Sequence, residues 1–319
     1  MAETQDVNPK TIKLGGSLQV CRMGFGTIYL TAQRSFGLRL PNSKELLQEA
    51  VRLGVNFFVT ADSYGPREAE DAIREALHPY EGLVISTKGG YSLNRESSDD
   101  WKENGSREHL LKAFDESLER LERIDLYQLH TPDQEVPYEH SLGGLKDLCD
   151  KGKIQFVGVS RVNWEQLRKA QGILGDRLVA IENCYNVFYP QGYTGDDERD
   201  NVNILAECER KGLAFIAYEP LAPEFVKQGV LNDVVLQKFP ERRKSVQKKL
   251  ELLQEVTKNY SVEKQPATIE QVMLAALLQK SEVIIPIPGT SKVHHLRQNV
   301  AAMELELEDN DLDLLWSVA

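Results

Sequence analysis

The stretch IQFVGVSR, residues 154–161, is an almost continuous apolar run that ends on a serine and an arginine. A strand that is covered on both faces has this composition, because neither face meets water. Seven further strand candidates lie at residues 22–27, 55–59, 83–87, 124–130, 178–183, 213–218 and 283–287. The chain therefore predicts eight short strands of a parallel sheet.

Segments with helical periodicity alternate with these strands, as at residues 43–54, 106–121, 140–152 and 163–174. Eight such units in 319 residues favour an α/β fold of the (β/α)8 TIM-barrel type. Periodicity alone does not exclude a doubly wound open sheet. We expect one domain over residues 1–319, with a long loop and an extra helix at about residues 222–265, where the alternation stops.

Single residues mark the expected ends of these helices. Ser43 and Ser106 stand where a side-chain oxygen can cap a helix start. Gly54, Gly152 and Gly212 stand where helices should end, because glycine accepts the left-handed conformation found there.

The charge balance bears on the partners of this chain. The net charge is −11, and phosphate binding needs clustered positive charge that this composition does not supply, so we expect no nucleic-acid partner. The basic run ERRKSVQKK at residues 241–249 is interpreted as one solvated face of a helix.

The cysteines and the apolar runs bear on the compartment. The four cysteines have no CxxC pair and no close histidine, which predicts neither a metal site nor a disulfide. No run approaches the length of a membrane span, and residues 1–10 lack the apolar core of a signal peptide. We therefore expect a cytoplasmic protein with reduced thiols, no membrane partner and a small-molecule substrate. The cysteines are Cys21, Cys149, Cys184 and Cys208.

Polar residues close the strand candidates, and a barrel builds its site at the C-terminal ends of its strands. Tyr64, Lys88 and His130 stand at three of these ends. A lysine lowers the pKa of a neighbouring phenol, and an imidazole can hold a substrate oxygen, so the three form a candidate proton-donor set. Read singly, they are equally a turn aromatic, a surface lysine and a core histidine.

Six sequence blocks resemble the signatures of the aldo-keto reductases, which are NADPH-dependent carbonyl reductases on a (β/α)8 barrel. The blocks are TADSYG, ISTKGG, IDLYQLHTPD, GVSR, AYEPLA and IPIPGTSKVHHLRQN, which begin at residues 60, 85, 124, 158, 217 and 285. The resemblance extends from about residue 11 to residue 316. The segments YGP, IREALHPY and IPGTSKVHHLRQN are most similar to the pyridoxal-reductase-like branch.

The resemblance implies that Tyr64 is the general acid, that Lys88 lowers its pKa and that His130 orients the substrate carbonyl. The family has a fourth catalytic residue, an aspartate five positions before the tyrosine, and this chain has Val59 there. Asp62 does not replace it, since relatives that keep the aspartate also have one just before the tyrosine. We therefore expect Lys88 to lack its partner and to shed its proton.

The resemblance also implies an NADPH site. Lys292 would pair with the adenosine 2'-phosphate, Thr290 and Ser291 would donate hydrogen bonds, and Gln298 and Asn299 would lie near the adenine. The other expected cofactor residues are Thr27, Ser160, Asn183, Tyr218, Leu221 and Gly289.

Three further departures from the family pattern form a candidate repurposed site together with Val59. Arg161 replaces an asparagine, Glu182 a glutamine and Glu219 a serine. One interpretation is a compensating ion pair between Arg161 and Glu182 on adjacent strands. The other is a changed function, because a carboxylate ~4 Å from the cofactor pyrophosphate costs on the order of 4 kcal/mol in an effective dielectric near 20, so that NADPH binding is weakened or lost.

Three functions stay open on these residues. One is NADPH-dependent reduction of an aldehyde or ketone with Tyr64 as general acid, impaired by Val59. Another is a cofactor-independent lyase, isomerase or cyclase that transfers protons through Tyr64, His130, Glu182 and Glu219. The last is a non-catalytic nucleotide-binding subunit.

Overall fold

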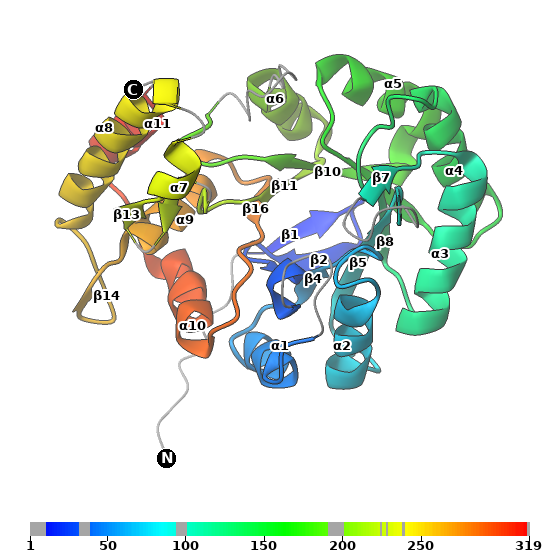
Figure 1. Cartoon of the computed structure of the whole chain (residues 1–319), viewed down its shortest axis with the longest axis horizontal. Coiled ribbons are helices and arrows are strands. Elements are labelled where there is room, and N and C mark those ends of the chain that lie inside the picture. The colour runs from blue at the N-terminus through cyan, green and yellow to red at the C-terminus, as the bar shows by residue number, and fades with distance from the viewer. Residues whose placement is uncertain are drawn as a thin grey trace.

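The computed structural model describes residues 11–31, 39–93, 101–190, 201–223, 225–227, 229–237 and 240–317. Eight parallel strands form one sheet in the order β16-β11-β10-β9-β8-β5-β4-β3. A hydrogen bond of 3.0 Å from the Gly24 N–H to the Pro286 carbonyl links the first strand to the last. Figure 1 shows the helices arranged around these strands, which confirms the predicted (β/α)8 barrel.

The strands of this barrel coincide with the eight predicted apolar runs. Neighbours run parallel in register, for example with Ser160 opposite Glu182 and Lys88 opposite Gln128. The barrel strands are β3 (Phe25–Gly26), β4 (Phe57–Val59), β5 (Val84–Gly89), β8 (Leu126–Leu129), β9 (Phe156–Ser160), β10 (Leu178–Cys184), β11 (Ala214–Tyr218) and β16 (Ile284–Pro286).

Helices follow the strands along the chain and cover the outside of the barrel. The helices are α1 (Ser43–Arg52), α2 (Glu68–Leu77), α3 (Arg107–Leu121), α4 (Tyr138–Asp150), α5 (Trp164–Leu174), α6 (Asn201–Lys211), α9 (Ile269–Lys280) and α10 (Val293–Ala301), with α11 (Asp309–Trp316) at the C-terminal end. Short 3-10 helices lie at η1 (Ile28–Leu30), η2 (Gly175–Arg177) and η3 (Ala302–Glu304).

The segment between β11 and α9 is the one that interrupts the sequence alternation. It contains α7 (Asp233–Leu236), the long helix α8 (Pro240–Thr257), and the strand pairs β12 (Val226–Lys227) with β13 (Val230–Leu231) and β14 (Ser261–Val262) with β15 (Gln265–Pro266). Val246, Leu250 and Leu253 of α8 are buried against this segment and α9. The extra helix therefore packs beside the barrel.

Side chains from the strands fill the barrel interior. Phe57, Leu126 and Ile216 belong to one buried cluster. The hairpin β1 (Thr11–Leu14) and β2 (Leu18–Cys21) adds Leu14 and Val20 to this cluster and lies across the centre of the ring in Figure 1. A second hairpin, β6 (Tyr91–Leu93) and β7 (Trp101–Glu103), follows β5. With its interior filled, the barrel offers its strand ends for binding.

The helix boundaries confirm most of the predicted signals. The Ser106 hydroxyl accepts a hydrogen bond from the His109 N–H and caps α3, and the three predicted glycines follow the ends of α1, α4 and α6 with positive φ. The prediction for Ser43 is wrong: this residue begins α1, and Asn42 occupies the cap position without a side-chain cap.

In the basic run at residues 241–249, residues 243–245, 247 and 248 are exposed, whereas Val246 and Lys249 are buried. Lys249 is 4 % exposed, and its ammonium donates hydrogen bonds to the Leu315 and Ser317 carbonyls at 3.0 and 2.6 Å. The prediction of an entirely solvated face is therefore wrong at Lys249, which fastens α8 to α11.

The cysteines, possible metal ligands and helix lengths of the described residues bear on thiol state, metal binding and membrane spanning. All four cysteines are buried and free. Within the described residues, no cluster of histidine, cysteine, aspartate or glutamate is placed to hold a metal ion. No described helix is both long enough and apolar enough to cross a membrane.

Candidate active site

The C-terminal ends of the strands surround a pocket that we call the inner cavity. It brings together residues from all eight barrel strands or the turns that follow them, and it contains every predicted catalytic position. Its lining residues are Gly26, Thr27, Ile28, Tyr29, Val59, Tyr64, Lys88, His130, Ser160, Arg161, Glu182, Tyr218, Glu219, Pro220, Leu221, Pro223, Ile287, Pro288 and Gly289.

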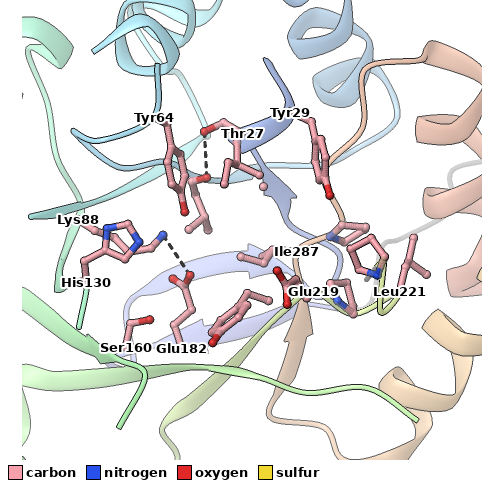
Figure 2. Close-up of a pocket in the computed structure, with 18 of the residues that line it drawn as sticks. Thr27, Tyr29, Tyr64, Lys88, His130, Ser160, Glu182, Glu219, Leu221 and Ile287 are labelled. Atoms are coloured by element: carbon pink, nitrogen blue, oxygen red, sulfur yellow. Dashed lines mark hydrogen bonds and ion pairs between the residues drawn. The ribbon is translucent and has the colours of Figure 1, made fainter. Parts of the chain in front are cut away.

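Lys88 has an anionic partner at the base of the inner cavity. Its Nζ lies 3.1 Å from Glu182 Oε1 and 3.1 Å from the Thr60 carbonyl oxygen, and the side chains of Lys88 and Glu182 are 1 % and 3 % exposed. Figure 2 shows the two side chains meeting beside His130 and below Tyr64. The expectation that Lys88 is unpaired is wrong, because a carboxylate on β10 reaches the lysine on β5.

The carboxylate beside Lys88 stands on a different strand from the one that the resemblance implies. Val59 is 1 % exposed and packs among the apolar side chains of the interior on β4, where the family aspartate would stand. Glu182 lies four strands away on β10. The charge beside Lys88 is therefore supplied from across the barrel.

Gln128 fixes the second oxygen of this carboxylate, and sequence reasoning missed it. Its Nε2 donates hydrogen bonds to Glu182 Oε2 at 2.7 Å and to Ser86 Oγ at 3.1 Å. A Cβ on Gly158 would lie 2.8 Å from Gln128 Oε1, so the glycine leaves room for the amide. The signal was a polar residue within the apolar run of β8.

Tyr64 and His130 lie together above the ion pair. Their rings make an edge contact with centroids 5.8 Å apart, and the ring of Tyr91 meets His130 at 4.8 Å. Lys88 Nζ lies 5.6 Å from the Tyr64 ring centroid. His130 Nδ1 is buried with no hydrogen-bond partner among the described residues.

Burial sets the protonation states of these groups. It raises the pKa of Tyr64 above its usual range; Glu182 raises this pKa further, and Arg161 lowers it. Burial lowers the pKa of Lys88, and Glu182 opposes that shift. The pKa of His130 is well below its usual value because of burial and the charges of Lys88 and Arg161. At neutral pH the site therefore holds a protonated phenol and a neutral imidazole.

Arg161 does not form the predicted ion pair with Glu182, whose carboxylate binds Lys88 and Gln128 instead. Only the backbone joins the two: the Arg161 N–H donates to the Glu182 carbonyl at 2.9 Å. Arg161 has a φ of 59°, and its guanidinium lies 5.3 Å from the ring centroid of Tyr218. The left-handed backbone turns the side chain away from its neighbour on β10.

Asn183 does not line the inner cavity or the second pocket that is described below. The other predicted cofactor residues each line one or both of these pockets. Its Oδ1 accepts from the Val162 N–H at 3.1 Å, and its Nδ2 donates to the Val162 carbonyl at 2.8 Å and to Asn201 Oδ1 at 2.9 Å. The side chain thus fixes the turn that carries Arg161.

Glu219 faces the inner cavity from the end of β11. Its Oε2 is 3.9 Å from Cys184 Sγ, and its carbonyl accepts a hydrogen bond of 3.0 Å from Asn186 Nδ2. Figure 2 places Glu219 beside Ile287, on the far side of the cavity from His130. The two predicted glutamates therefore occupy different ends of the pocket.

A second pocket, the outer cavity, adjoins the inner one through the shared residues Tyr29, Leu221, Pro223 and Gly289. It lies at the N-terminus of α10, where free N–H groups and the helix dipole favour an anion. Lys292 is exposed there. The outer cavity is also lined by the predicted residues Thr290, Ser291, Gln298 and Asn299.

Comparison with known proteins shows the family of this chain. The model of the Aldo/keto reductase family matches residues 22–319, and the chain belongs to this family. An uncharacterized oxidoreductase of Schizosaccharomyces pombe is 34% identical over 304 residues, 93% of this chain and 86% of the relative. The aldo-keto reductase yakc [NADP(+)] of the same organism is 30% identical over 318 residues, 94% and 88% of the two chains.

A solved structure gives the same result. The chain is similar to the thermostable aldo-keto reductase Tm1743, determined in complex with the inhibitor epalrestat, with a TM-score of 0.74 and 26% identity over 97% of this chain and 99% of that one. Family membership and the names of these relatives support an oxidoreductase with a nicotinamide cofactor and a small-molecule substrate.

Proposed function

We propose that this chain reduces an aldehyde or ketone with NADPH and that Tyr64 is the general acid. The observation that carries the proposal is the Lys88–Glu182 ion pair of 3.1 Å. The strongest objection to reductase activity was a lysine without a carboxylate, and Glu182 supplies one. We infer that Glu182 replaces the missing aspartate as the group that keeps Lys88 charged.

The chain's own residues would act as follows. NADPH, when bound, supplies the hydride that reduces the carbonyl carbon. His130 Nε2 donates a hydrogen bond that orients the carbonyl oxygen, and protonated Tyr64 transfers its proton to that oxygen. Lys88, held by Glu182 and Gln128, stabilises the tyrosinate that is left until solvent returns a proton.

The two connected cavities fit a dinucleotide. The N-terminus of α10 and Lys292 would hold phosphate in the outer cavity, with hydrogen bonds from Thr290 and Ser291. The nicotinamide end would then lie in the inner cavity near Ser160 and Tyr218, with Thr27, Leu221 and Gly289 along the way.

The cofactor-independent alternative requires a carboxylate that is ready to accept a proton. Both oxygens of Glu182 already have partners, Lys88 and Gln128, so this residue fits a general base poorly. The names of the relatives also support a redox enzyme rather than a silent subunit.

Two measurements test the proposal. We expect NADPH to bind when its fluorescence is followed in a titration, and a generic aldehyde to be reduced with loss of absorbance at the nicotinamide band. Glu182→Gln should lower kcat/KM by roughly 100-fold, since the buried lysine loses its anion. Glu255→Gln on α8, whose side chain is 73 % exposed, is the matched control. Absence of NADPH binding at high micromolar concentration would refute the reductase.

A further inference from the structure

We infer that Arg161 is a binding site for a substrate carboxylate, so that the preferred substrate is an oxo acid. This inference rests on the proposed reductase function and names the substrate class of the same site. It starts from a difference between the two cations of the inner cavity: Lys88 forms an ion pair with Glu182, whereas Arg161 forms none among the described residues, although Glu219 lines the same cavity.

The guanidinium of Arg161 is packed but has no hydrogen-bond acceptor within the described part of the chain. It lies over the face of Tyr218 at 5.3 Å, an arrangement that holds the cation while leaving its N–H groups free. Five N–H donors in a planar fork match the two oxygens of a carboxylate. A guanidinium that lines a pocket and has no hydrogen-bond acceptor there is suited to bind an anionic ligand.

The backbone shows that this orientation is built into the fold. Arg161 has a φ of 59°, a conformation that is unfavourable for a residue with a Cβ and persists only where surrounding contacts impose it. Those contacts are the hydrogen bond from its N–H to Glu182 and the two bonds that Asn183 makes to Val162. The asparagine is in turn held by Asn201.

Arg161 lies within electrostatic reach of the groups that would hold the carbonyl. Arg161, Tyr64 and His130 line the same cavity, and the charge of Arg161 lowers the pKa of both Tyr64 and His130. One small molecule in this cavity could therefore place a carboxylate on Arg161 and a carbonyl oxygen between Tyr64 and His130.

Glu219 is the other carboxylate that lines the inner cavity. In the described part of the chain it forms no ion pair with Arg161, and its Oε2 instead lies 3.9 Å from the Cys184 thiol. Its charge opposes a second anion, so the pocket would admit a single carboxylate at Arg161 rather than a dicarboxylic acid.

The reaction is balanced with the groups already named. The carbonyl carbon gains hydride from the reduced nicotinamide, and the carbonyl oxygen gains the Tyr64 proton. The products are a hydroxy acid and the oxidised cofactor, and the carboxylate is unchanged. Its role is to bind, which raises the local concentration of the carbonyl and sets its orientation.

The experiment compares phenylglyoxylate with its neutral methyl ester at saturating NADPH. We expect a higher kcat/KM for the acid, and Arg161→Gln should lower the value for the acid roughly 10–100-fold while changing the ester less than 3-fold. Arg161→Lys should restore part of the acid rate. Arg168→Gln, an exposed position on α5, should leave both rates unchanged.

A binding measurement that needs no turnover separates the carboxylate site at Arg161 from the proposed reductase function. Benzoate should bind the wild-type protein in calorimetry and bind Arg161→Gln at least 10-fold more weakly. If neither carbonyl is reduced but benzoate binds through Arg161, the reductase fails and the carboxylate site stands. Equal losses for acid and ester, or an NADPH affinity reduced as much as that of benzoate, would overturn the inference, because Arg161 would then serve the fold or the cofactor.

Discussion

The inner and outer cavities share Leu221 and Gly289. The lysine of the inner cavity is buried, whereas the lysine of the outer cavity is exposed to solvent. In the inner cavity Lys88 and Glu182 are almost fully buried and meet at 3.1 Å. In the outer cavity Lys292 is exposed at the N-terminus of α10. A buried cation needs a fixed partner, whereas an exposed one is stabilised by water and free to meet a ligand. The comparison separates residues that set the chemistry from residues that set cofactor affinity.

The largest effect should come from removing the proton donor of the inner cavity. Tyr64→Phe deletes the phenolic proton and keeps the ring that contacts His130, so we expect kcat to fall roughly 1,000-fold. The NADPH dissociation constant should stay within about 2-fold, because Tyr64 does not line the outer cavity. Stopped-flow reduction and a fluorescence titration measure the two quantities. A parallel loss of NADPH binding would show that the cavities act as one unit.

A rescue experiment tests the origin of the charge beside Lys88. Glu182→Gln should destabilise the fold by about 3 kcal/mol in urea unfolding, since it leaves a buried cation without an anion. Adding Val59→Asp restores a carboxylate from β4 and should recover most of the stability and the activity. If the double variant is no more stable and no more active than Glu182→Gln, Lys88 needs Glu182 for a reason other than its charge.

A substitution in the outer cavity should have a smaller effect, and its effect on NADPH affinity should depend on salt concentration. Lys292→Met removes the exposed cation, and we expect NADPH to bind roughly 10-fold more weakly, with little change in NADH binding. High salt should reduce the difference, because exposed charges are screened. A kcat for the saturated enzyme that falls with this variant would contradict the division between the cavities.

The smallest effect concerns acid stability. Because the pKa of His130 is lowered in the folded protein, only the unfolded chain gains this proton as pH falls below about 6.5, the ordinary histidine value. Stability should therefore decline on acidification through this residue, and His130→Gln should reduce the loss between pH 6.5 and 5.5 by about 1 kcal/mol. Urea unfolding at the two pH values measures it, and an unchanged slope would place the protonated histidine in the folded state.

The positions of the strands could be predicted from the sequence, and so could the gathering of Tyr64, Lys88 and His130 in one pocket. Continuous apolar runs identify buried strands, and the ends of parallel strands share one rim. Those two rules need no knowledge of side-chain direction.

The pairing inside the site could not be predicted. Ser160 lies opposite Glu182 on the adjacent strand, and the sequence predicted that the next residue, Arg161, would pair with this glutamate. The left-handed backbone of Arg161 instead directs its side chain to Tyr218. The contact between Glu182 and Lys88 crosses the interior, so it depends on side-chain length, and the Gln128 amide that binds Glu182 depends on the space left by Gly158. Neither property appears in the spacing of residues along the chain.

The position of the carboxylate on β10 also constrains the order in which this site could have evolved from the family pattern. A lineage that acquired Glu182 first could then lose the aspartate at position 59 with Lys88 charged and paired throughout. The reverse order passes through an ancestor with an isolated buried ammonium, which is both unstable and a poor catalyst. Of these two orders, only the one that passes through a temporary surplus of negative charge keeps the buried ammonium paired at every step.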